Sequence, residues 1–232
     1  FSSINSLEIL KSISSRSCLA AFTAFFISIF FGHWFIKRLR SLKVGEDTTK
    51  TDSEELKRMH FDKKNTPTMG GIVIIVSILV SVLLWCNIYN EYILLLMFTL
   101  IWFGVLGFID DYIKLTQTKA AGLTDVSKLF FQSALGLILG LILYFHMKKF
   151  AWGTHVVIPL VKDFRPDLGP LYILFVTFFI VGMSNAVNLT DGLDGLAIGC
   201  GIIAGIAFAV VAYVSGRMDF SDYLRILYIP GS

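Results

Sequence analysis

The sequence predicts an all-α fold, a polytopic membrane protein with about six transmembrane helices in a single domain, residues 1–232. Of its 232 residues, 55% are hydrophobic and 16% are charged, and the mean hydropathy is +0.72. The hydrophobic residues gather in uncharged runs of about 18 residues or more, which are long enough to cross a bilayer as helices. A soluble core does not need so many uninterrupted apolar runs, so the composition excludes the soluble protein classes.

The expected spans are joined by loops of very different length. The first span ends where the long basic loop 37–70 begins, and Pro67 with the glycines after it defines a fixed turn into the second. Loop 89–91 is very short, loop 110–128 opens on two aspartates, and loop 148–170, with its Val, Ile, Pro and Gly, predicts a small periplasmic hairpin. An Asn/Asp segment joins the last two spans. The six spans are expected at about 19–36, 71–88, 92–109, 129–147, 171–187 and 193–214.

The distribution of basic residues predicts the orientation of these spans. Nine of the 20 Lys and Arg lie between Lys37 and Lys64, and loops rich in Lys and Arg remain in the cytoplasm. Loops 37–70 and 110–128 and the Asn/Asp segment are therefore expected in the cytoplasm, with both ends of the chain outside. Acidic residues are interleaved with the basic cluster, which argues against nucleic acid as a partner.

The Asn/Asp segment is the most informative part of the chain. Asn185, Asn188, Asp191 and Asp194 recur at every third residue, at the end of an apolar run. Polar groups at membrane depth are unfavourable unless something binds or pairs with them. Carboxylates beside amides suit a hard cation or a polar ligand such as a nucleoside. The alternative is that these side chains pair with neighbouring helices.

A pair of adjacent carboxylates, Asp110 and Asp111, ends the third expected span. Two such groups repel each other unless a cation or a shared proton compensates. The pair therefore favours a magnesium or acid/base site that acts on phosphates, against the alternative of a solvated helix end. Of the lysines that follow, most are expected to anchor at the interface, and one or two are candidates to contact a diphosphate.

The segment before the second span is a third candidate. Lys63 precedes a Thr-Pro-Thr-Met-Gly-Gly run, in which Thr66 or Thr68 can cap the helix. Free N–H groups at a helix start, with a lysine nearby, favour an anion. The simpler alternative is a basic membrane anchor followed by a helix cap. The cysteines and histidines show no disulfide framework and no zinc-ligand spacing.

These motifs, in this order and spacing, resemble the bacterial phospho-N-acetylmuramoyl-pentapeptide transferases, the MraY branch of the polyprenyl-phosphate N-acetylhexosamine-1-phosphate transferase superfamily. The resemblance runs from about Arg16 onward and is carried by residues 66–71, 107–112 and 185–196 and the run 213–216. It implies transfer of phospho-MurNAc-pentapeptide from UDP-MurNAc-pentapeptide to undecaprenyl phosphate, which yields lipid I and UMP in peptidoglycan synthesis. It also implies dependence on Mg2+, a multi-pass place in the bacterial inner membrane with the site facing the cytoplasm, and the homodimer as one option.

The resemblance also implies roles for single residues. Asp110 and Asp111 match an aspartate pair implicated in catalysis and are candidate Mg2+ ligands. A lysine near the diphosphate matches Lys114, and positions that line the same cleft match Lys63 and Thr68. The segment that contributes to nucleotide binding matches Asn185, Asn188, Asp191 and Asp194.

The sequence departs from this family in three respects. The family has ten spans, its main magnesium aspartate and a histidine-rich motif lie in later loops than this sequence contains, and Asn65 stands where Gly is usual. We therefore expect a fragment with little activity alone. The alternatives are a sister enzyme that uses UDP-GlcNAc, an inactive remnant, and a transporter with carboxylates near the bilayer midplane.

Overall fold

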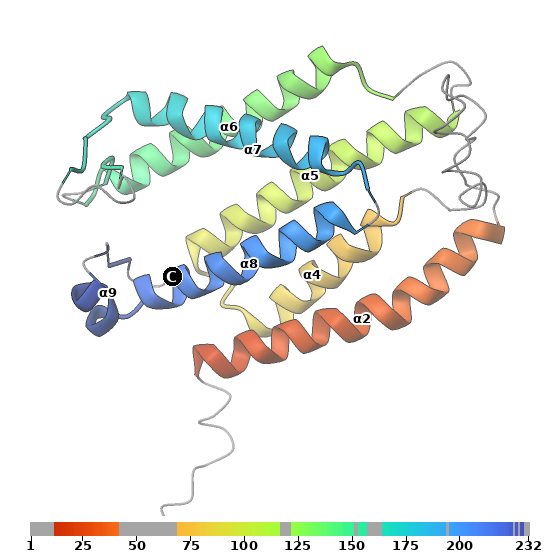
Figure 1. The fold of residues 1–232 in the computed structure, drawn as a ribbon, viewed down its shortest axis with the longest axis horizontal. Coiled ribbons are helices and arrows are strands. Elements are labelled where there is room, and N and C mark those ends of the chain that lie inside the picture. Colours follow the sequence, from red (N-terminus) through yellow and green to blue (C-terminus); the bar gives the residue numbers. More distant parts are fainter. Residues whose placement is uncertain are drawn as a thin grey trace, which may run out of the picture. The chain divides into compact units, whose positions relative to one another are not determined.

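The structure is a computed structural model that describes residues 12–41, 69–116, 122–150, 153–156, 164–193, 195–224, 226, 228 and 229. All regular elements in these residues are helices, which confirms the all-α prediction (Figure 1). The helices are α2 (Ile13–Ser41), α4 (Gly71–Trp85), α5 (Glu91–Thr116), α6 (Asp125–Met147), α7 (Leu171–Thr190), α8 (Leu196–Ser215) and α9 (Met218–Leu224).

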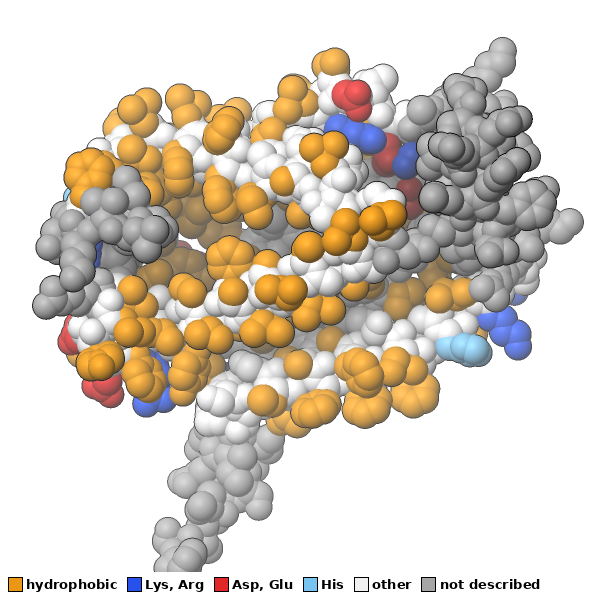
Figure 2. Space-filling view, in the orientation of Figure 1, with side chains coloured by type: hydrophobic (Ala, Val, Ile, Leu, Met, Phe, Trp, Pro, Cys, Tyr) orange, Lys and Arg blue, Asp and Glu red, His pale blue; other side chains and the backbone are white. Residues whose placement is uncertain are grey.

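Five of these helices are long and apolar enough to cross a membrane, and each overlaps one of the predicted spans. They cover Ile13–Leu39, Glu91–Thr116, Asp125–Met147, Leu171–Thr190 and Leu196–Ser215. Many large apolar side chains on them are exposed, such as Phe178 and Ile203. In Figure 2 hydrophobic side chains cover much of the visible helix surface, as lipid contact requires.

The second predicted span, 71–88, is a shorter helix than expected. Helix α4 has 15 residues, so it is about 22 Å long, whereas the hydrocarbon core of a bilayer is about 30 Å thick. Its backbone becomes extended at Cys86, and the side chains of two asparagines then accept backbone hydrogen bonds. Asn87 Oδ1 accepts from the Tyr89 N–H, and Asn90 Oδ1 accepts from the Tyr92 N–H. These side-chain turns stop the helix before its apolar run ends.

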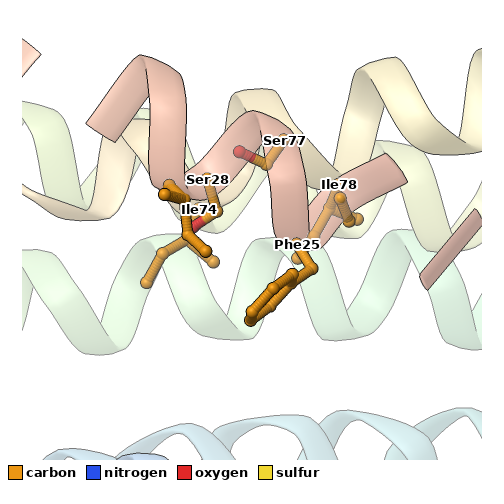
Figure 3. A pocket seen from close by; sticks show the side chains of 7 residues that line it. Phe25, Ser28, Ile74, Ser77 and Ile78 are labelled. Carbon is orange, nitrogen blue, oxygen red and sulfur yellow. The ribbon is translucent and has the colours of Figure 1, made fainter. Parts of the chain in front are cut away.

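The chain divides into two compact units, residues 1–125 and 126–232, and each is described by itself. In the first unit α2 packs along α4. The Ser81 hydroxyl donates to the Ala20 carbonyl, and Trp85 Nε1 lies 2.9 Å from Thr23 Oγ1. A shallow apolar groove between the two helices is lined by Phe25, Ser28, Ile74, Ser77 and Ile78, among others (Figure 3). The single-domain prediction remains a prediction.

In the second unit α6 and α7 approach closely through two glycines. Gly136 and Gly140 lie one turn apart on α6 and are buried. A Cβ added to Gly136 would lie 2.8 Å from Thr177 Cα, and one added to Gly140 would lie 2.8 Å from the Ile173 carbonyl oxygen. Small residues spaced in this way let two helix backbones meet in a membrane, where the packing itself holds the helices together.

The predicted hairpin in loop 148–170 consists of one antiparallel bridge, His155–Asp167, with no strand in its described residues. Two backbone hydrogen bonds flank the bridge, Val156 N–H to Pro166 O and Leu168 N–H to Thr154 O, both 3.1 Å. The Thr154 hydroxyl, and then the Gly169 N–H, donate to the Asp167 carboxylate and lower its pKa below the ordinary value. Pairing ends there because Gly169 takes a left-handed conformation and α7 begins at Leu171.

Candidate active site

The aspartate pair lies within α5, not at its end. The helix continues to Thr116, seven residues past the predicted boundary at 109, and carries Asp110, Asp111 and Lys114 in its last two turns. Lys114 Nζ is 2.7 Å from Asp110 Oδ2 and 3.7 Å from Asp111 Oδ1. A carboxylate one turn before a lysine stabilises a helix, and a lysine in the last turn interacts favourably with the helix dipole. The lysine thus supports the helix through the carboxylate pair.

Lys114 also changes the electrostatics of the pair. The Asp110 side chain is 15% exposed and that of Asp111 is 32% exposed, whereas Lys114 is 40% exposed. A cation beside both carboxylates offsets their mutual repulsion. The accessible ammonium group can in turn meet the negative charge of an incoming phosphate. The cluster therefore combines two carboxylate acceptors with one accessible positive charge.

Two backbone N–H groups from outside α5 complete the cluster. The Met69 N–H donates to Asp111 Oδ2 at 3.3 Å, and the Leu123 N–H donates to Asp110 Oδ1 at 2.7 Å. Met69 belongs to the Thr-Pro-Thr-Met-Gly-Gly run, and Leu123 to the loop after α5. Helix α5, the loop after it and the segment before α4 therefore meet at the aspartate pair.

The other candidates before α4 lie outside the described residues. These are Lys63 and Thr68, and also Thr66, for which a capping role was expected. Helix α4 begins after Gly70, its N-cap, which has no side chain to form a capping hydrogen bond. The roles of the lysine and the two threonines stay predictions.

The Asn/Asp segment belongs to the second unit and is mostly helical. Helix α7 continues through Asn185 and Asn188 to Thr190 and ends at Asp191, whose N–H donates to the Val187 carbonyl. Asn188 and Asp191 are exposed, and Asp194 lies outside the described residues. On an α-helix, positions three apart differ by about 60° in direction. The side chains of Asn185 and Asn188 therefore fan out instead of forming one straight row.

Asn185 is engaged with a neighbouring helix. Its Nδ2 lies 3.0 Å from Gln132 Oε1 on α6 and 2.9 Å from the Val181 carbonyl oxygen, and Gln132 Nε2 lies 3.1 Å from Ser184 Oγ. Gln132 is only 6% exposed. Interhelical pairing, the alternative considered for this segment, thus applies to Asn185. Sequence reasoning passed over Gln132, although a lone amide inside an apolar run was a visible signal.

The aspartate pair fits a magnesium ion that a substrate helps to coordinate. No group of three or more His, Cys, Asp or Glu that could hold a metal occurs among the described residues. Mg2+ does not need such a cage, because it is usually bound by one or two carboxylates together with water and substrate phosphates. Asp110 and Asp111 supply those carboxylates, and Lys114 Nζ is the cation that shares them.

The aspartate pair and the Asn/Asp segment both lie within a match to a known protein family. Residues 92–231 match the model of glycosyl transferase family 4. Residues 63–75 match signature 1 of the phospho-N-acetylmuramoyl-pentapeptide-transferases. The first match contains α5 from Tyr92 onward and the Asn/Asp segment, and the second contains Met69 and the first turn of α4.

Proposed function

The chain belongs to glycosyl transferase family 4, whose model covers more than half of its residues, and we propose that it transfers phospho-MurNAc-pentapeptide from UDP to undecaprenyl phosphate. The products are lipid I and UMP. The observation that carries this proposal is the hydrogen bond from Met69, inside signature 1, to Asp111. It joins the segment that carries the signature to the carboxylate pair.

The side chains of the cluster suit phosphoryl transfer, which needs positioning and charge neutralisation more than covalent chemistry. A phosphate oxygen of the lipid attacks the sugar-linked phosphorus, and the bond from that phosphorus to the UMP oxygen breaks. Lys114 neutralises charge on the diphosphate. Asp111, the more exposed carboxylate, accepts the proton of the lipid phosphate.

Asp110 and Asp111 would also hold Mg2+, which when bound supplies further charge neutralisation on the diphosphate oxygens. Asn188 and Asp191 are exposed polar groups available to the nucleotide. Asn185 acts less directly, since Gln132 holds its amide.

The basic loop 37–70 supports an orientation with this site on the cytoplasmic side of the bacterial inner membrane. Single cysteines at Thr116 and Gly192, in a protein without its three native cysteines, would test it. Both should react with a membrane-impermeant thiol reagent only when the cytoplasmic side is open. Labelling from opposite sides would refute the shared face.

The substrate is tested by measuring UMP release from the purified protein in detergent with undecaprenyl phosphate. UDP-MurNAc-pentapeptide and UDP-GlcNAc are compared, with and without EDTA. Release from the first alone supports the proposal, and release from the second alone identifies a GlcNAc-1-phosphate transferase. Release from neither refutes both as activities of this chain alone. Asp111→Asn should abolish turnover and leave the thermal unfolding curve in place, and near wild-type turnover would remove Asp111 from the chemistry.

A further inference from the structure

Two left-handed residues flank the aspartate pair, one in each of the loops that reach it. Met69 has φ 69° and is the one non-glycine residue with positive φ in the described part of the chain, and Gly122 has φ 94°. Residues other than Gly, Asn and Asp rarely adopt this conformation, because Cβ comes too close to the following carbonyl oxygen. A strained Met beside a candidate catalytic carboxylate therefore points to a structural demand at that position.

Each left-handed residue directs one backbone N–H at one carboxylate. Met69 donates its own N–H to Asp111, and the N–H after Gly122, that of Leu123, donates to Asp110. Consecutive residues of an α-helix point about 100° apart. The two carboxylates therefore leave the helix in different directions, and two separate loops supply their backbone donors.

Gly122 is also crowded by the cluster itself. A Cβ at this position would lie 2.5 Å from Asp110 Oδ1 and 2.8 Å from Lys114 Cε. Both atoms belong to the ends of side chains, so an alanine would displace the carboxylate and the lysine instead of the backbone. The absence of a side chain at residue 122 thus keeps Asp110 and Lys114 where they are.

We propose that Gly122 and Met69 are positioning residues that fix the two carboxylates through left-handed backbone turns. Gly122 acts on Asp110 and Lys114, and Met69 acts on Asp111. The catalytic meaning of this arrangement rests on the proposed function, whereas the contacts themselves do not. Backbone donors suit this task because their direction is set by the fold and not by a side-chain rotamer.

The decisive variant is Gly122→Ala, with Gly169→Ala as its matched control. Gly169 is also left-handed, with φ 49°, but a Cβ there would meet nothing within 4 Å. Both variants carry the same kind of backbone strain, and only the first disturbs the carboxylate. We expect Gly122→Ala to lower kcat by about 10- to 100-fold, as loss of a supporting contact commonly does. KM should change less than about threefold, and Gly169→Ala should leave both near wild type. Equal kcat in the two variants would overturn the proposal for Gly122.

A double-mutant cycle on thermal unfolding tests the contact without any assay of turnover. Gly122→Ala should lower Tm in the wild-type background and lower it less in the Asp110→Ala background, where the clashing carboxylate is gone. Equal decreases in the two backgrounds would refute the contact. If the wild type released no UMP, the proposed function would fail, while this cycle would still test the contact between residue 122 and Asp110.

Met69 is tested by rescue. Met69→Gly keeps the N–H and relieves the backbone strain, so kcat should stay within about threefold of wild type. Met69→Val keeps the N–H but places a β-branched residue in a conformation that it tolerates poorly, so kcat should fall by about tenfold or more. If Met69→Gly and Met69→Val had the same kcat, the left-handed conformation at Met69 would have no positioning role.

Discussion

The contact between α6 and α7 offers a sharp test of how packing supports the Asn/Asp segment. In Gly136→Ala the new Cβ would lie 2.8 Å from Thr177 Cα. Carbon atoms in favourable contact are about 3.5–4.0 Å apart, so the two backbones must separate by about 1 Å. Backbone atoms cannot swing aside as a side-chain end can. Overpacking of this kind destabilises a fold by roughly 1–3 kcal/mol.

The same separation would reach Asn185. Gln132 lies one helical turn before Gly136, and its Oε1 accepts from Asn185 Nδ2 at 3.0 Å. An increase of about 1 Å takes this distance beyond the range of a hydrogen bond. We therefore expect Gly136→Ala to raise the KM for the sugar nucleotide as well as to destabilise the protein, because the start of the polar segment loses its support.

The measurement is thermal unfolding in detergent, with Gly182→Ala on α7 as the control. A Cβ at Gly182 would meet nothing within 4 Å, and both substitutions gain the same helix propensity of about 1 kcal/mol. For a chain of this size each kcal/mol corresponds to about 2–4 °C in Tm. Gly136→Ala should therefore unfold several degrees below Gly182→Ala. Equal Tm values would refute the reasoning that the glycine is required for close packing.

Three further predictions concern the two sites and the loop between α6 and α7. Lys114→Met should lower Tm little, because an i,i+4 ion pair on a helix contributes about 0.3–0.5 kcal/mol, yet lower UMP release more than tenfold; Lys114→Arg should retain more activity, and equal losses would exclude a charge role. Gln132→Leu should raise the sugar-nucleotide KM about tenfold or less, through Asn185, with little change in kcat; an unchanged KM would separate the two residues functionally. The lowered pKa of Asp167 means that its ionised form stabilises the bridge, so this contribution is complete above the ordinary Asp pKa and is lost as pH falls through the lowered one. As pH falls over that acidic range, hydrogen exchange at the Leu168 amide should accelerate more in the wild type than in Asp167→Asn. The same pH dependence in both proteins would contradict this role of the Asp167 carboxylate.

The sequence was sufficient to predict the long apolar helices, because such runs have few other structures open to them in a membrane. The short helix α9 was not predicted. Where the prediction misplaced boundaries, local side-chain interactions decided. Helix α5 continues past 109 because Asp110 and Lys114 pair along it, and α4 stops at Trp85 because Asn87 and Asn90 form turns of their own. Charge alone indicated a loop after residue 109, and hydrophobicity alone indicated a longer α4.

The candidate site was less accessible to sequence reasoning. The Asp pair was identifiable because adjacent carboxylates need a partner. Only the family resemblance distinguished Lys114 from the other lysines of its predicted loop, and the structure then placed its ammonium group beside both carboxylates. The donors at Met69 and Leu123 are backbone groups, which every residue except proline carries, so no residue type marks them. Gly122 and Gln132 acquire meaning only from what packs against them.

The short length of α4 affects the lipid around it. A helix about 8 Å shorter than the hydrocarbon core obliges the surrounding leaflets to thin, or one end of the helix to sit below the headgroup layer. The end that begins at Gly71 adjoins Met69 and hence Asp111. Thinner lipid at this position would bring the headgroup layer closer to the carboxylates. A lipid phosphate would then meet them while its isoprenoid chain stays among the acyl chains.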